Sequence, residues 1–226
     1  MANDGSPTHN VGRTNFYYLL IALLLFLVII PLADELGSGG VPIVRGLVFS
    51  SLLVIGIWSL RGGGRFFTLG MIFVVGGLVL NFLAVQTDSV FYQHTSLLSM
   101  IGFLLVAISF TLRQVVFGTD MSANRLLGVV CVYLLLGVIW ALSYSMIELA
   151  IPGSFSGFEA WSDGGWDSEW LYFSFVTMTT LGYGDLLPIS ATARALAYLQ
   201  AVFGQFYLAV LVAGLVSAYI SIRRGQ

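Results

Sequence analysis

Residues 179–185 read Thr-Thr-Leu-Gly-Tyr-Gly-Asp and lie between the last two apolar spans of a very hydrophobic chain. A run of backbone carbonyls that all face one axis can replace the water shell around a cation such as K⁺. Facing them the same way requires alternating backbone conformations, some with φ > 0, which glycine adopts at little cost. Gly182 and Gly184 suit this requirement, and the Thr180 hydroxyl can add a ligand at the inner end. The segment therefore predicts a cation-binding loop.

The loop resembles the selectivity filter of the potassium channel family, whose usual core is Thr-Val-Gly-Tyr-Gly. Leu181 replaces the valine, and because the carbonyl rather than the side chain binds the ion, we expect potassium selectivity to survive. The resemblance covers residues 169 to about 216, whereas residues 1–120 resemble no specific family. The resemblance implies that K⁺ is the transported ion and that Thr180, Leu181, Gly182 and Tyr183 bind it. The filter residues are Thr180, Leu181, Gly182, Tyr183 and Gly184.

Four neighbouring residues are expected to support the filter. Thr179 precedes it, and Asp185 follows it at the mouth. In some relatives a glutamate of the pore helix pairs with this aspartate, but the matching position here is Val176. Asp185 is then expected to bond with Tyr172 or with water. The departure bears on filter stability and inactivation, and conduction is expected to be retained.

The composition predicts a membrane protein with several spans. Only 9% of the residues are charged and 58% are hydrophobic, and the mean hydropathy is +0.94, values that no soluble domain of this size shows. The net charge of −2 argues against nucleic-acid binding. Apolar runs of roughly 20 residues each predict six spanning helices. They cover residues 16–33, 41–60, 66–86, 95–116, 122–150 and 193–222.

Charge predicts the orientation of these spans. With a cytoplasmic N-terminus, seven of the nine arginines fall in inner segments, and only Arg45 and Arg194 fall in outer ones. This asymmetry follows the positive-inside rule, so both termini are expected in the cytoplasm and the filter loop is expected to enter from outside. We therefore expect a multi-pass protein of the cell membrane, in contact with lipid.

The expected fold is an all-α integral membrane protein with six transmembrane helices, a re-entrant pore helix and a filter loop. A cytoplasmic segment (1–15) precedes a four-helix region (16–117) and a pore domain (118–226). The pore domain comprises an outer helix (122–150), a pore helix (168–179), the filter (180–184) and an inner helix (193–222). The chain has one filter-like loop and no internal repeat. A fourfold ring of carbonyls therefore requires a homotetramer.

Aromatic residues surround the pore helix, among them Trp170 and Phe173. The favoured interpretation is anchoring at the membrane interface, and the other is a cuff that holds the filter's diameter.

The inner helix contains candidate gating residues. Gly204 lies 20 positions beyond Gly184, where the hinge glycine of the family's inner helix falls, and close helix packing is the other interpretation. Side chains below it could face the pore and gate by dewetting, or face lipid. The hinge and gate candidates are Gly204, Leu208, Val212, Gly214 and Val216.

The first four spans lack a voltage sensor. Such a sensor needs several arginines at every third position of the fourth span, and this span has Arg113 alone. We therefore expect weak or no voltage dependence. The stimulus that opens the pore stays unassigned, and no ligand-binding domain is expected after residue 222.

The sequence thus predicts a potassium-selective channel that conducts K⁺ passively and is not an enzyme, with no cofactor and no small-molecule substrate. No metal-spaced cluster, phosphate loop or nucleophile–base pair suggests chemistry. Two alternatives stay open at this point. One is a poorly selective channel for monovalent cations, and the other is a non-conducting membrane subunit or sensor with a vestigial pore.

Overall fold

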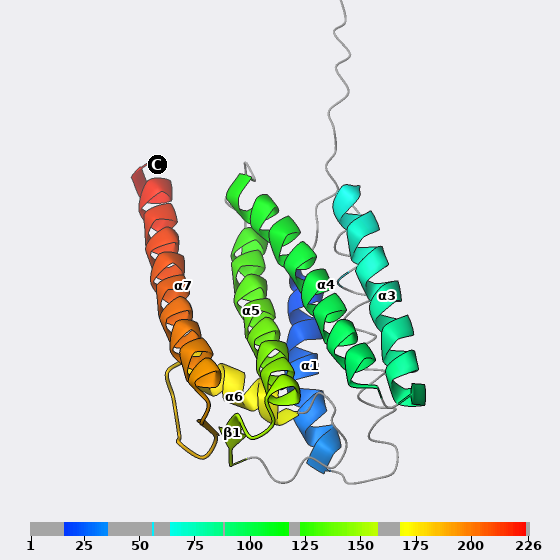
Figure 1. Ribbon diagram of the computed structural model, residues 1–226. Coiled ribbons are helices and arrows are strands. Elements are labelled where there is room, and N and C mark those ends of the chain that lie inside the picture. Colours follow the sequence, from blue (N-terminus) through cyan, green and yellow to red (C-terminus); the bar gives the residue numbers. More distant parts are fainter. Residues whose placement is uncertain are drawn as a thin grey trace, which may run out of the picture.

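The computed structural model describes residues 16–35, 56, 64–87, 89–117, 123–157 and 168–224. The described chain is helical, with one short two-stranded ladder. Element labels follow Figure 1. The elements in chain order are α1 (Phe16–Glu35), α3 (Arg65–Thr87), α4 (Val90–Phe117), α5 (Ala123–Ala150), β1 (Phe155–Ser156), α6 (Ser168–Met178), β2 (Leu187–Pro188) and α7 (Ala191–Arg224).

Four of the described helices are long and apolar enough to cross a bilayer, which needs about 20 residues. Their candidate spanning segments are Arg65–Ala84, Val90–Val115, Asn124–Ala150 and Ala191–Leu211. The apolar part of α1, Phe16–Leu32, is shorter. The expected span at residues 41–60 and the N-terminal segment 1–15 lie outside the described residues, apart from residue 56. A helical protein with apolar spans is therefore established, as the composition predicts.

The helices run roughly side by side, with α1, α3 and α5 pointing one way and α4 and α7 the other (Figure 1). The first residues of α1, the start of α5 and the end of α7 lie at one end of the bundle. The short helix α6, β1 and the loop that joins α6 to α7 lie at the opposite end. Because α6 has only 11 residues, it cannot cross a bilayer, and it lies across the ends of its longer neighbours.

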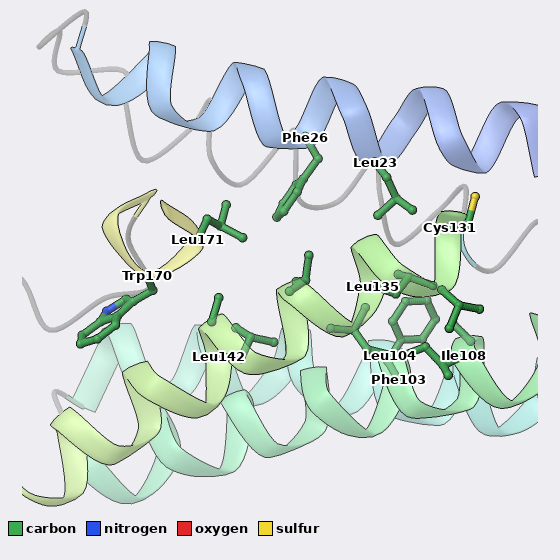
Figure 2. Close-up of a cluster of buried hydrophobic side chains, with 14 of the residues drawn as sticks. Leu23, Phe26, Phe103, Leu104, Ile108, Cys131, Leu135, Leu142, Trp170 and Leu171 are labelled. Carbon is green, nitrogen blue, oxygen red and sulfur yellow. The ribbon is translucent and has the colours of Figure 1, made fainter. Parts of the chain in front are cut away.

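The hydrophobic core lies between α1, α4 and α5 (Figure 2). Phe26 of α1 and Phe103 of α4 approach α5 from two sides, and both are almost fully buried. Leu171 of α6 belongs to the same cluster, so α1 lies against α6 as well as α5. Helix α3 packs mainly on α4 and stands at the edge of the bundle. The core therefore joins α1 directly to α6, the helix that precedes the loop at residues 180–184.

Polar contacts fix the first turn of α1 on α5. The Phe16 amide donates to Asn124 Oδ1 at 2.9 Å, and the Cys131 thiol lies 3.7 Å from the Phe16 carbonyl. A Cβ on Gly128 would lie 3.0 Å from the Phe16 ring, so this glycine permits the close approach. An otherwise unpaired amide at the start of a helix is satisfied in this way by a neighbouring helix.

Glycine also permits the close packing of α3 on α4, which yields a test. A Cβ on Gly102 would lie 2.5 Å from the Phe73 ring, whereas one on Gly76 would lie 3.8 Å from its nearest neighbour, Ser99 Oγ. We expect Gly102→Ala to lower the apparent free energy of unfolding by about 1–3 kcal/mol through overpacking, while Gly76→Ala leaves it nearly unchanged. Thermal unfolding of the purified protein in detergent measures both, and equal melting temperatures for the two variants would contradict this account of the interface.

Candidate functional site

The backbone of residues 180–184 alternates in conformation. Thr180, Gly182 and Gly184 have φ values of 59°, 53° and 82°, whereas neither Leu181 nor Tyr183 has a positive φ. Thr180 is the one non-glycine residue in the described ranges with φ > 0, an uncommon and strained conformation for a β-branched side chain. The loop thus has the alternation that a file of similarly directed carbonyls requires. The ion-binding role of these five residues stays a prediction.

Carbonyls at the end of α6 hold the inner part of this loop. The Val176 carbonyl accepts hydrogen bonds from the Leu181 amide at 2.9 Å and the Gly182 amide at 3.3 Å. The Thr179 hydroxyl donates to the Phe175 carbonyl at 2.7 Å. Val176 stands where some relatives have a glutamate, and here it contacts the loop through its backbone carbonyl. These bonds satisfy the last carbonyls of α6, which have no partner within the helix.

The outer part of the loop is held by Asp185. The Tyr172 hydroxyl donates to Asp185 Oδ2 at 2.5 Å, and the Leu186 amide donates to Asp185 Oδ1 at 3.0 Å. The bond from Tyr172 is the main reason why the pKa of the Asp185 carboxyl lies below its usual value, because it stabilises the charged form. Of the two partners expected for Asp185, the structure places Tyr172 there.

A short antiparallel ladder, which the sequence did not predict, anchors the chain after the loop. Phe155 of β1 lies opposite Pro188 of β2, and Ser156 lies opposite Leu187. The Ile189 amide extends the ladder by donating to the Ser154 carbonyl at 2.7 Å.

Glu148 holds the turn before this ladder, and Gly157 follows its first strand. The Glu148 carboxylate, at the end of α5, accepts hydrogen bonds from the Gly153 amide at 2.6 Å and the Phe155 amide at 3.1 Å. Gly157 has φ 92°, and a Cβ there would overlap the Asp185 carbonyl oxygen, so only glycine fits. The end of α5 and the segment after the filter are thereby joined into one unit.

A buried hydrogen-bond network joins the three helices around the loop. Gln200 of α7 donates through Nε2 to the carbonyl and hydroxyl of Ser174 on α6, at 2.9 and 2.8 Å. The Ser174 hydroxyl donates to the Gly137 carbonyl of α5 at 2.6 Å, and the Tyr144 hydroxyl of α5 donates to Gln200 Oε1. The side chains of Tyr144, Ser174 and Gln200 have no solvent exposure. Each of these polar groups is therefore paired where water cannot reach it.

Sequence reasoning missed this network. A glutamine in an apolar span was the available signal, because a polar side chain in a membrane helix usually bonds to a neighbouring helix. The identity of its partners could not be read from the sequence, since they come from two other helices, α5 and α6. The close contact of α5 and α6 also depends on Gly137, where a Cβ would overlap the Phe175 ring.

The favoured interpretation of the aromatic residues is wrong for two of them. Trp170 is fully buried and Phe173 nearly so, and both rings pack edge-on against Phe155 at centroid distances of 5.0 and 5.5 Å. Phe173 also meets Tyr144 at 4.9 Å. These rings fill the space between α5, α6 and β1 instead of facing the membrane interface. Edge-to-face packing at such distances adds stability beyond the burial itself.

The candidate gating residues lie along α7. A Cβ on Gly204 would overlap the Met178 carbonyl oxygen at the end of α6, so the packing interpretation has a specific contact. Leu208 is half-buried, and Gly214 is exposed, with no atom within 4 Å of the position that a Cβ would take there. The side chains of Val212 and Val216 lie outside the described ones. The hinge and the dewetting gate stay predictions.

Comparisons with known proteins agree with this geometry. The family model described as Ion channel matches residues 128–221, which takes in α5, α6, the loop and most of α7. This part of the chain, from α5 through most of α7, is therefore similar to the ion channel family.

Two relatives of the channel segment are potassium channels, which confirms the resemblance seen in the sequence. The inward rectifier potassium channel Kirbac3.1 of Paramagnetospirillum magnetotacticum is 38% identical over 82 residues, which are 34% of this chain and 24% of that protein. The two-pore potassium channel 5 of Arabidopsis thaliana is 36% identical over 56 residues, 25% of this chain and 14% of that protein. The chain thus spans at most about a quarter of these relatives' length. No solved structure matches.

The buried network of the channel segment can be tested by removing one or both partners. Tyr144→Phe leaves Gln200 Oε1 without its donor, and we expect it to lower the free energy of unfolding by about 1–3 kcal/mol. Gln200→Leu alone leaves the Tyr144 hydroxyl without its acceptor and removes both bonds to Ser174, whose hydroxyl still donates to the Gly137 carbonyl, so it should cost more. The double variant Tyr144→Phe/Gln200→Leu should lose less than the sum of the two, because it leaves fewer polar groups unpaired. Thermal unfolding in detergent measures the cycle, and strictly additive losses would argue against a coupled network.

The pH dependence of Asp185 offers a second test. Its pKa is lowered in the folded protein, so its bond to Tyr172 stabilises the loop at neutral pH and is lost as the pH falls through that lowered pKa. We expect Tyr172→Phe to move the pKa of Asp185 up toward its ordinary value. Carbon-13 NMR of labelled aspartate carboxyls between about pH 2 and 6 measures the change. Tyr17→Phe, an exposed tyrosine on α1, serves as the control, and identical titration of Asp185 in all three proteins would refute the assignment.

Proposed function

We propose that this protein is a potassium-selective channel that conducts K⁺ passively through a homotetrameric pore. Carbonyls of residues 180–184, with the Thr180 hydroxyl, replace the hydration shell of the ion. The observation that carries the proposal is the alternation of φ along Thr-Leu-Gly-Tyr-Gly, in a segment similar to the ion channel family. The names of both relatives, which are potassium channels, favour K⁺ over other cations.

The exposed loop supports assembly with further copies of the chain. Leu181 and Tyr183 are 55% and 68% exposed on the single chain, and no atom lies within 4 Å of a Cβ built on Gly182 or Gly184. Non-helical backbone at membrane depth has to be covered by protein or line a water-filled cavity, because lipid cannot satisfy its polar groups. The α7 face beside the loop is also apolar and exposed, at Phe203, Phe206 and Val210. Four copies around one axis would cover both surfaces.

Six spans with both termini in the cytoplasm fit the placement of the described helices. The loop lies at the opposite end of the bundle from the end of α7, as expected of a re-entrant loop that enters from outside (Figure 1). Helix α1 ends near the loop, whereas α3 begins at the other end. A spanning segment at residues 41–60, as the hydropathy predicts, accounts for these positions. The arginine asymmetry sets the direction.

Gating in this proposal does not depend on a voltage-sensing α4. Arg113 is the only arginine of α4, which has no lysine, and it is exposed near the helix end. A single charge there supplies little of the gating energy that several arginines supply in a sensor. Gly204 is the proposed hinge and the α7 segment beyond it the proposed gate.

The reversal potential in planar bilayers tests the proposal, with K⁺ on one side and Na⁺ on the other. We expect a value near the potassium equilibrium potential. Gly182→Ala should abolish this selectivity, because alanine at φ 53° is strained by roughly 1–2 kcal/mol and the carbonyl would turn from the axis.

Gly153→Ala is the matched control for that variant. Gly153 has φ 82° and open space around it, but it lies in the turn before β1 instead of in the filter. It should keep the reversal potential of the unmodified protein. A reversal near zero for the unmodified protein would indicate a non-selective cation pore, and no current under any voltage, pH or lipid would favour a non-conducting subunit.

A further inference from the structure

Helix α7 makes two contacts with α6 and a third with the loop that follows α6. Gln200 bonds to Ser174 on the second turn of α6, Gly204 lies against the Met178 carbonyl at its last residue, and Gln205 reaches the filter itself. Gln205 Nε2 lies 3.4 Å from Thr180 Oγ1 and donates a hydrogen bond to it. The first two contacts hold the backbone of α7 beside the filter, so the position of the third side chain is set by them.

Gln200 and Gln205 lie in different surroundings. Gln200 is fully buried, whereas Gln205 is exposed on the single chain and bonds to Thr180, the first residue of the loop. An exposed amide is free of the packing that fixes Gln200, and its contact is directed at the first residue of the proposed filter. Its role is therefore not explained by the packing of the three helices.

The chemistry of the Thr180 hydroxyl gives this contact a consequence. A hydroxyl has one proton and two lone pairs, and it rotates to suit its partners. When the Gln205 amide donates to one lone pair of this hydroxyl, the other lone pair can bind a cation. The hydroxyl proton then points away from the amide and from the cation. The remaining proposed ligands are backbone carbonyls, whose orientation is fixed by φ and ψ. Thr180 is thus the filter residue whose ligand a neighbouring side chain can orient.

We propose that Gln205 is a specificity-determining residue of the innermost cation site. Its amide holds the Thr180 hydroxyl with a lone pair available to the ion, and it thereby sets the affinity of that site for cations of the size of K⁺. This inference rests on the proposed function, since it requires that Thr180 binds the ion. It assigns to Gln205 a role in the site that neither the filter motif nor the hinge position assigns.

Binding of Ba²⁺ to the purified full-length chain tests this role, because Ba²⁺ is close to K⁺ in size and carries twice the charge. Isothermal titration calorimetry in a sodium buffer measures the dissociation constant without requiring an open gate. Gln205→Met keeps the length of the side chain and removes the amide, so we expect binding about three- to tenfold weaker, the range of one ordinary hydrogen bond. Gln205→Glu keeps the volume, accepts the hydroxyl proton and adds a negative charge, so binding should tighten by about tenfold or more.

Repeating Gln205→Met in Thr180 variants shows whether the substitution acts through the Thr180 hydroxyl or by another route. In Thr180→Val, which has no hydroxyl, Gln205→Met should change the dissociation constant by less than about twofold, because interacting residues are not additive. In Thr180→Ser, which keeps the hydroxyl, the effect of Gln205→Met should persist. Gln86→Met replaces an exposed glutamine on α3, at the opposite edge of the bundle from α7, and should leave Ba²⁺ binding unchanged.

Two results would overturn the inference while leaving the proposed function intact. One is Ba²⁺ binding by Gln205→Met within twofold of the unmodified protein, and the other is an equal effect in the presence and absence of the Thr180 hydroxyl. A failure of the proposed function itself is distinguishable, because the unmodified protein would then bind neither Ba²⁺ nor K⁺.

Discussion

Gln200 satisfies a set of buried polar groups at the point where α5, α6 and α7 meet. Its amide bonds to the carbonyl and hydroxyl of Ser174 and accepts a bond from Tyr144, and Ser174 bonds in turn to Gly137. Buried polar groups without partners are costly, and more so away from water, so this arrangement permits one relative placement of the three helices. The positions of α6 and of the loop that follows it depend on that placement.

Contacts with the surrounding structure hold both ends of the loop at residues 180–184. At its inner end the Val176 carbonyl accepts two amides of the loop, and at its outer end Asp185 is bound by Tyr172 and joined to the ladder of β1 and β2. The strained conformation of Thr180 persists because the surrounding structure determines it. The loop can therefore keep alternating φ values although its own residues make few contacts within the single chain.

The sequence predicted the parts of the site that depend on local chemistry. Glycines at alternate positions indicated φ > 0 at Gly182 and Gly184, and apolar length indicated α4, α5 and α7 close to their observed bounds. The third residue with positive φ, Thr180, was not foreseen, because threonine rarely adopts that conformation.

Features that depend on contacts between distant segments could not be predicted. The ladder has two residues in each strand, too few for an alternating pattern. Glu148 holds the turn before it, and Gly157 permits the close approach of the segment that follows β1 to Asp185. Composition alone could not show that Trp170 faces inward, since the same residues suit a membrane interface. The direct packing of α1 on α6 likewise depends on a shared core, and the division at residue 117 into two regions stays a prediction.

The central claim is that four copies of the loop bind a file of dehydrated ions. The most direct test is an experimental structure of the detergent-purified protein in a thallium salt, because Tl⁺ has a size close to that of K⁺ and scatters anomalously. The account predicts a fourfold assembly with anomalous peaks on its axis, between successive rings formed by the oxygens of residues 180–184. An assembly without a fourfold axis at this loop, or an axis with no ion beside these residues, would contradict it.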